Sequence, residues 1–204
     1  MAAQRRIGIM GGTFNPIHYG HLIIAENACE QYGLEQVIFM PTGRAPHKDF
    51  SGEEMTRHRC EMVKLAIQGN DKFSISLFEV RREQTSYTFE TLREMQRIYP
   101  DAKLYFILGA VSLFDFDNWY RPDIICREAV ILAAVRDNLT ESKVDSQIQY
   151  LKDTFHGEIH RLETPNFNVS SKTIRARLRH GQTIRYMVPE KVEEYIKRQG
   201  LYRE

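Results

Sequence analysis

The chain has 204 residues, with 28 Lys and Arg against 27 Asp and Glu, and a formal net charge of +1. Its 42% hydrophobic and 27% charged content is that of a globular protein and excludes a disordered or collagen-like chain. A charge this close to zero gives no general attraction to nucleic acid or to an anionic membrane, so we expect neither as a partner. The longest apolar run, 129–135, has seven residues, against the roughly 20 that span a bilayer.

The N-terminus and the cysteines bear on cellular location. Residues 1–6 lead directly into a strand-like segment without the apolar stretch of a signal peptide, so we expect a cytoplasmic protein. Cys29, Cys60 and Cys126 are odd in number and far apart, which favours buried free thiols over a disulfide framework or a zinc site.

No linker divides the chain. We therefore expect one domain over 1–204, with a helical portion from about 170, and the sequence leaves open a homo-oligomer.

Apolar runs alternate with helix-like periodicity along the chain. Strands are expected at 6–10, 37–40, 73–78, 103–108, 129–135 and 158–162. Helices are expected at 20–32, 55–68, 88–99, 142–155, 171–179 and 189–198, with a loop at 41–49. Ser86 or Thr88 is the expected cap of the third helix, and Pro189 the first residue of the last. Strands apolar on both faces, alternating with helices, predict an α/β fold: a doubly wound, Rossmann-like parallel sheet with helices on both faces.

Ligands of such a sheet bind beyond the carboxyl ends of its strands, where residues 11–21 read Gly-Gly-Thr-Phe-Asn-Pro-Ile-His-Tyr-Gly-His. Free backbone N–H groups and the helix dipole favour an anion there, but the glycines fit neither a dinucleotide fingerprint nor a P-loop. His18 and His21 lie three apart on one helix face and could bind neighbouring oxygens of a polyphosphate. Gly20 would let backbone and ligand approach closely. The histidines could instead be polar caps or bind a metal, although no third ligand lies close by.

Residues 169–175, Val-Ser-Ser-Lys-Thr-Ile-Arg, form a second candidate anion site. Ser170 or Ser171 is expected to cap a helix whose first amides face an anion, and Arg175 supplies a fork of donors. Taken alone, the segment equally fits a capped helix with a solvated basic face. Trp119, just after another strand, could be a stacking platform or a core side chain.

These segments resemble the nucleotidylyltransferase superfamily and, in their order over 6–202, the bacterial nicotinate-nucleotide adenylyltransferases. Residues 11–21 are similar to the loop whose His-x-Gly-His binds the triphosphate of ATP, and 169–175 to its partner Ile-Ser-Ser-Thr-x-Ile-Arg. Further similar segments are Pro-His-Lys at 46–48, Ser-Tyr-Thr at 86–88, Trp-Tyr at 119–120 and the closing helix at 188–196.

The resemblance implies transfer of the adenylyl group of ATP to nicotinate mononucleotide, giving nicotinate adenine dinucleotide and pyrophosphate in NAD biosynthesis. It implies that the catalytic residues are His18, His21 and Arg175. The residues implied to bind ATP are Gly11, Gly12, Thr13, Phe14, Gly20, Gly109, Val111, Ser170, Ser171 and Thr173. Those implied to bind nicotinate mononucleotide are Asn15, Lys48, Tyr87, Thr88, Trp119 and Tyr120. Mg²⁺ is expected to arrive with ATP and not at a dedicated protein metal site.

Two positions depart from the family pattern. Val111 stands where the family usually has Asp, and Asn15 where many relatives have Asp. The valine side chain cannot accept a hydrogen bond from a ribose hydroxyl. The valine predicts a form with weakened activity or altered nucleotide specificity. Alternatively, Asp115 or Asp117 takes over the role of the missing carboxylate. Two rivals are the phosphopantetheine adenylyltransferase, which the Trp-Tyr and Ser-Tyr-Thr segments disfavour, and a non-catalytic nucleotide-binding protein, which Val111 alone supports.

Overall fold

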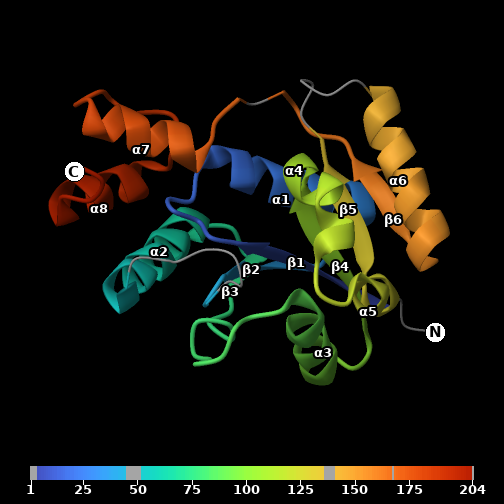
Figure 1. The fold of residues 1–204 in the computed structure, drawn as a ribbon. Helices are drawn as coiled ribbons and strands as arrows, with labels where there is room; N and C mark the ends of the chain where they lie inside the picture. Colours follow the sequence, from blue (N-terminus) through green and yellow to red (C-terminus); the bar gives the residue numbers. More distant parts are fainter. Residues whose placement is uncertain (1–3, 45–51, 136–140, 167, 204) are drawn as a thin grey trace.

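The computed structural model describes residues 4–44, 52–135, 141–166 and 168–203 (Figure 1). Their strands pair in parallel in one sheet with the order β3-β2-β1-β4-β5-β6. The strands are β1 (Arg5–Gly12), β2 (Gln36–Pro41), β3 (Phe73–Ile75), β4 (Ala102–Gly109), β5 (Val130–Ala134) and β6 (Ile159–Leu162). The expected doubly wound parallel sheet is confirmed.

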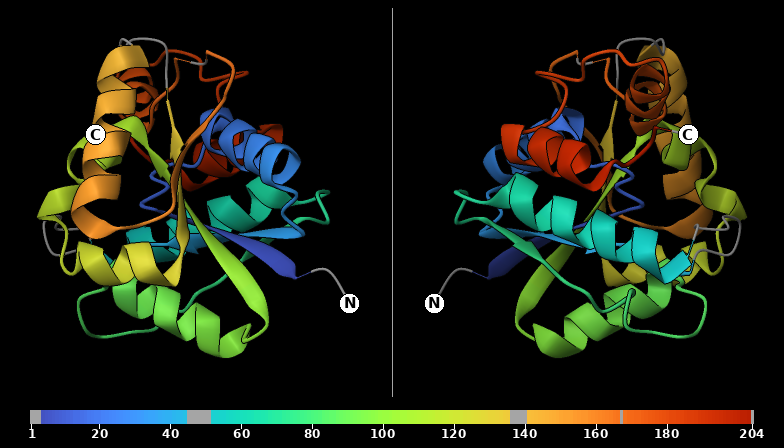
Figure 2. Two further views of the ribbon diagram at one scale, coloured as in Figure 1. Left: turned by 90° about the vertical axis from the view of Figure 1, so that its right-hand side faces the viewer. Right: turned by 90° about the vertical axis from the view of Figure 1, so that its left-hand side faces the viewer.

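Helices cover both faces of this sheet. They are α1 (Tyr19–Tyr32), α2 (Gly52–Ile67), α3 (Thr88–Ile98), α4 (Ala110–Phe114), α5 (Pro122–Glu128), α6 (Glu141–Phe155), α7 (Ser171–Arg179) and α8 (Glu190–Gln199), with a 3₁₀ turn, η1, at Phe116–Asn118. Buried residues of α1 and α2 pack on one face in a cluster that also takes in α7 and α8. Helices α3, α4, α5 and α6 pack on the other face. Figure 2 shows α8 beside α2.

The two cores follow from the period of two along each strand. In β4, Leu104 and Phe106 face the cluster of α3 to α6, whereas Tyr105 and Ile107 between them face the α1 side. All four are at most 5% exposed. Burial on both faces explains why these strands are continuous apolar runs in the sequence.

The order of the strands reverses between β1 and β4. From β1 the chain moves outward through β2 and β3, and from β4 it moves outward on the other side through β5 and β6. The connections after these two strands therefore leave on opposite faces and leave the ends of β1 and β4 accessible, the place where ligands of such sheets bind. Gly11, Gly12 and Gly109 stand there.

Several expected elements differ from the observed ones. The strand expected at 73–78 ends at Ile75, since the chain turns away after Ser76 donates to the Phe39 carbonyl. Residues 110–128, for which no element was expected, form α4, η1 and α5, which are too short for a clear periodicity. Among the described residues, no helix is long and apolar enough to cross a membrane.

Two expected caps are also wrong. Tyr87, and neither Ser86 nor Thr88, is the N-cap residue of α3, because the Ser86 N–H pairs with the Arg44 carbonyl and Thr88 already lies in the helix. Pro189 is the N-cap residue of α8 and not its first helical residue.

Candidate active site

The ends of β1 and β4 form an open glycine-lined surface. Gly11 and Gly109 are exposed, and a Cβ added at Gly109 would meet no atom within 4 Å. At Gly12 a Cβ would lie 3.0 Å from the Phe14 ring, so a side chain there would crowd this ring. Val111 follows in the first turn of α4 and is 86% exposed. A ligand at the reversal of the sheet can therefore approach the backbone of both strands.

The turn after β1 has an unusual backbone conformation at Phe14. Its φ is 48°, in the left-handed region that a bulky residue adopts at a cost of about 1–3 kcal/mol. The Phe14 ring is 2% exposed and contacts the His21 ring edge-on, with centroids 5.1 Å apart. Such a conformation persists only where the surroundings hold it, and here it brings a ring beneath His21.

His18 and His21 are stacked at the start of α1, with ring centroids 3.8 Å apart. His18 is buried at 2% exposure, while His21 is partly exposed. The His18 backbone N–H donates to His21 Nδ1 at 3.3 Å, so in the neutral ring the proton lies on Nε2. The His21 ring therefore carries its donor proton on Nε2 and packs against the buried His18 ring.

Gly20 makes room for this stack. It is buried, and a Cβ there would lie 3.0 Å from the His18 ring. The missing side chain of Gly20 therefore leaves room for the His18 ring, and the close approach of a ligand to its backbone stays a prediction.

The segment at 169–175 lies directly against the glycine turn. The Ser171 hydroxyl donates to the Pro16 carbonyl at 2.8 Å, and Arg175 Nη1 donates to the Asn15 carbonyl at 2.7 Å. Ser170 caps α7, since its hydroxyl accepts from the Thr173 N–H at 3.1 Å. The two candidate anion-binding segments of the sequence are thus in direct contact.

Asn15 is held from two sides. Besides the Arg175 contact to its carbonyl, its side-chain oxygen accepts a hydrogen bond from the Tyr202 hydroxyl. Burial raises the pKa of Tyr202, so this hydroxyl stays protonated and donates. The sequence did not suggest Tyr202, because this residue follows α8 and belongs to none of the recognised motifs.

The residues expected to hold the pyridine nucleotide divide into two groups. Tyr87 and Tyr120 lie together, with ring centroids 4.9 Å apart, and Thr88 begins α3 beside them. Trp119 is partly buried and packs on Phe116 and Phe106 at 5.3 and 6.1 Å between ring centroids.

Phe106 links Trp119 to the glycine turn. A Cβ at Gly11 would lie 3.6 Å from its ring, on which Trp119 packs edge-on. Trp119 is therefore anchored on its inner side close to the end of β1. The core and platform interpretations of this indole are compatible.

Glu79 is a buried carboxylate that the sequence did not single out. It is 7% exposed, accepts from the Thr91 hydroxyl at 2.7 Å and takes the Gly43 backbone N–H. Burial raises its pKa, against the opposing effect of these hydrogen bonds and of Arg82. Glu79 joins the segment after β2 to the helix that begins beside Tyr87.

Some expectations fall elsewhere. Lys48 and the rest of 46–48 lie outside the described residues. Asp115 and Asp117 are exposed, and Asp115 accepts from the Asn118 side chain at 3.1 Å. Within the described ranges, no group of three or more His, Cys, Asp or Glu side chains could hold a metal ion.

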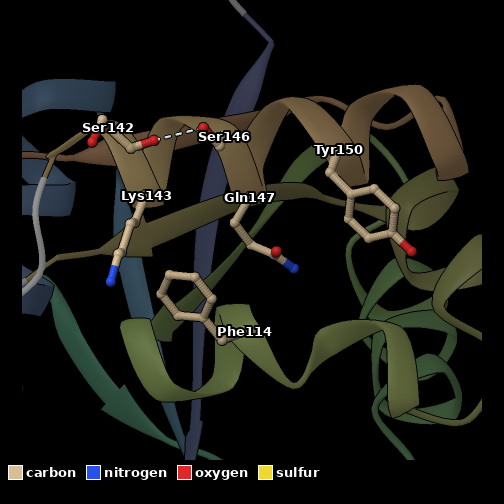
Figure 3. A pocket seen from close by; sticks show the side chains of 6 residues that line it. All are labelled: Phe114, Ser142, Lys143, Ser146, Gln147 and Tyr150. Atoms are coloured by element: carbon tan, nitrogen blue, oxygen red, sulfur yellow. Dashed lines mark hydrogen bonds between the residues drawn. The ribbon is translucent and has the colours of Figure 1, made fainter.

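An open pocket of about 460 Å³ lies between α4 and α6 (Figure 3). It is lined by Phe114, Ser142, Lys143, Ser146, Gln147 and Tyr150. None of these is an expected site residue, and Gln147 donates to the Leu113 carbonyl, which ties α6 to the short helix that carries Val111.

Comparison with protein families first defines the class. The family model described as Cytidylyltransferase-like matches residues 9–177, which include both segments of the site. The fold agrees: a Plasmodium falciparum nicotinic acid mononucleotide adenylyltransferase complexed with NaAD superposes with a TM-score of 0.77 at 18% identity, covering 97% of each chain. The same enzyme complexed with APC gives 0.74 at 17% identity, again with 97% of each chain.

Curated relatives narrow the class further. A protein of Lachnoclostridium phytofermentans is 44% identical over 98% of this chain and 100% of its own, and one of Moorella thermoacetica is 41% identical over 97% and 92%. Both carry the name "Probable nicotinate-nucleotide adenylyltransferase". The chain belongs to the nicotinate-nucleotide adenylyltransferase family, which confirms the resemblance found in the sequence.

Ser170→Ala should lower the free energy of unfolding by about 1 kcal/mol, because the Thr173 N–H loses its capping acceptor. Urea denaturation followed by circular dichroism measures this. Ser170→Asp keeps an acceptor at the cap and should retain most of the stability. Equal stability of Ser170→Ala and wild type would show that the cap contributes nothing.

Glu79→Gln should gain stability relative to wild type as pH rises above 4.5, the ordinary pKa of the carboxyl. Burial makes the folded protein bind the Glu79 proton more tightly than the unfolded chain, so wild-type stability falls as pH rises through this window, whereas glutamine does not titrate. Denaturation at several pH values between 4 and 8 measures the difference.

The matched control is Glu94→Gln. Glu94 is partly exposed, and its hydrogen bond with Arg97 lowers its pKa, so this variant should show no gain with rising pH. A Glu79→Gln difference that does not vary with pH would contradict the assignment.

Proposed function

We propose that this protein transfers the adenylyl group of ATP to nicotinate mononucleotide, giving nicotinate adenine dinucleotide and pyrophosphate in NAD biosynthesis. One observation carries the proposal: Ser171 and Arg175 bind the turn after β1 at the reversal of the sheet. The names of the relatives, at 40% identity and above over nearly the whole chain, support this activity.

The chemistry needs positioning more than reactive side chains. The attacking group is the phosphate monoester of nicotinate mononucleotide, which is largely ionised near pH 7, so it needs no general base. The protein has to bring two polyanions together and hold the attacking and leaving oxygens in line at the α-phosphorus. It also has to stabilise the charge that develops on pyrophosphate.

Donors at the glycine turn fit this task. His21 offers its Nε2–H, and the first amides of α7 follow the Ser170 cap. The Arg175 guanidinium has five N–H donors, and its bond to the Asn15 carbonyl leaves others for phosphate oxygens. That bond also fixes the direction of the guanidinium, so less side-chain entropy is lost when ATP binds.

The pyridine nucleotide would lie toward Trp119, Tyr87 and Tyr120. Trp119 is held on its inner side by Phe106 and Phe116, which favours a rigid stacking platform for a flat ring. Donors near Tyr87 and Thr88 would suit the carboxylate of nicotinate better than an amide, which presents a donor as well as an acceptor.

We propose that Mg²⁺ enters with ATP as part of the substrate and bridges its phosphates. We also propose a cytoplasmic location. Cys29, Cys60 and Cys126 are free and buried, and burial raises the pKa of Cys29 to about 11 and of Cys126 to about 12. Such thiols are unreactive core groups in a reducing compartment.

Pyrophosphate release with MgATP and either nicotinate or nicotinamide mononucleotide tests the proposal. We expect the nicotinate form to be strongly preferred by wild type and by Val111→Asp. Loss of a buried charge-assisted hydrogen bond to the substrate lowers activity roughly ten- to 150-fold. Because Val111 is 86% exposed, we expect the activity of Val111→Asp to exceed that of wild type by about tenfold at most.

The other outcomes are equally informative. Turnover by Val111→Asp alone would show a weakened or retargeted member of the family. ATP binding without pyrophosphate release in both proteins would overturn the proposal in favour of a non-catalytic nucleotide-binding protein.

His21→Ala and Arg175→Ala should each lower turnover about 10²- to 10³-fold, as loss of a preorganised donor does elsewhere. Steady-state pyrophosphate release measures the loss. The matched controls are Arg179→Ala, an exposed arginine four residues further along α7, and His160→Ala, a partly exposed histidine of β6. Wild-type rates in either site variant would contradict the assigned roles.

A further inference from the structure

Arg59 on α2 is a charged side chain that the motifs did not single out, and it is fully buried at 0% exposure. Its Nη1 donates to the Thr13 carbonyl at 2.7 Å, and its Nη2 donates to the Thr42 carbonyl at 2.8 Å. Nη2 also lies 3.1 Å from the Thr56 hydroxyl oxygen. One guanidinium thus binds two backbone carbonyls that are 29 residues apart in the chain.

Because this charge is buried, it needs the acceptors that it contacts. Burial lowers the pKa of the Arg59 guanidinium, so the carbonyl dipoles must replace the water that would otherwise solvate it. A planar fork can bind two acceptors in fixed directions, which the single ammonium of lysine cannot reproduce. The geometry therefore depends on arginine.

Both carbonyls belong to the site. Thr13 lies in the turn after β1 and Thr42 directly follows β2, where its own N–H donates to the Gly12 carbonyl at 2.9 Å. Arg59 adds a second connection between these two segments. The glycine turn cannot shift relative to the end of β2 without breaking a bond to a buried charge.

The Thr13 contact also acts on the residue that follows. In a trans peptide the carbonyl and the next N–H point in opposite directions, so a Thr13 carbonyl held by Arg59 turns the Phe14 N–H away from α2. Phe14 then adopts its left-handed conformation with its ring against His21. The orientation of a turn amide and the support of His21 depend on one peptide plane.

We propose that Arg59 is a positioning residue for ATP: by binding the Thr13 and Thr42 carbonyls it orients the turn whose amides and His21 contact the phosphates. The inference rests on the proposed function. Arg59 acts through the turn and does not touch the nucleotide. Ser171 and Arg175 of α7 bind the same turn at the Pro16 and Asn15 carbonyls.

The test compares Arg59→Lys and Arg59→Ala with Met62→Ala. Met62 lies on the same helix and is equally buried at 0% exposure, but its side chain belongs to the apolar core. Thermal unfolding first establishes that each variant is folded at the assay temperature. KM and kcat are then measured separately for ATP and for nicotinate mononucleotide.

We expect the KM for ATP to rise about tenfold or more in both Arg59 variants, as for a lost hydrogen bond to a charged group. The KM for nicotinate mononucleotide should rise less, because the Arg59 hydrogen bonds to the Thr13 and Thr42 carbonyls act first on the turn after β1, whereas Tyr87, Trp119 and Tyr120 lie further along the chain. Met62→Ala should lose stability with the KM for ATP unchanged. An unchanged KM for ATP in Arg59→Lys, or an equal rise in Met62→Ala, would overturn the proposal.

Chemical rescue supplies a second readout that keeps the proposal testable if Arg59→Lys fails to fold. Ethylguanidinium at millimolar concentration should lower the KM for ATP of Arg59→Ala severalfold and leave Met62→Ala unaffected. No rescue in a folded Arg59→Ala would count against the proposal. Failure of wild type to release pyrophosphate would instead refute the proposed function itself, before any variant is compared.

Discussion

Three backbone carbonyls in the turn after β1 are each bound by a side chain from elsewhere in the chain. Arg59 of α2 holds the Thr13 carbonyl, while Arg175 and Ser171 of α7 hold those of Asn15 and Pro16. A turn that carries a left-handed Phe14 would relax without such restraints. Because its carbonyls are engaged outward, the turn keeps its N–H groups and His21 in a fixed arrangement at the reversal of the sheet.

This restraint is suited to adenylyl transfer. The reaction joins two polyanions and releases a third, so its barrier depends on dipoles that are already oriented before the substrates bind. A flexible turn would have to be ordered by ATP itself, at the cost of binding free energy. The stacked His18 and His21 follow the same principle, since the buried ring supports the exposed one.

Much of the fold could be predicted from the chain alone. Apolar runs such as 103–108 indicated buried parallel strands, and the glycines at the end of β1 indicated where a ligand would bind. The short helices between Gly109 and Val130 could not be predicted, because none has enough turns for a hydrophobic period. For Gly20 the structure adds a packing reason that the sequence did not suggest, since the His18 ring occupies the space that its missing side chain leaves.

The sequence by itself determined the family, the order of strands and helices and the two segments that carry chemistry, because these depend on local periodicity and on residue types at short spacing. Tertiary structure alone placed Arg59, Glu79 and Tyr202 in contact with segments of the candidate site. Their partners are backbone groups or side chains of other segments of the chain. Every residue type has a main-chain carbonyl, so the identity of Thr13 in the sequence does not reveal that Arg59 binds it. Only the packing of α2, α3 and α8 around the sheet brings them there.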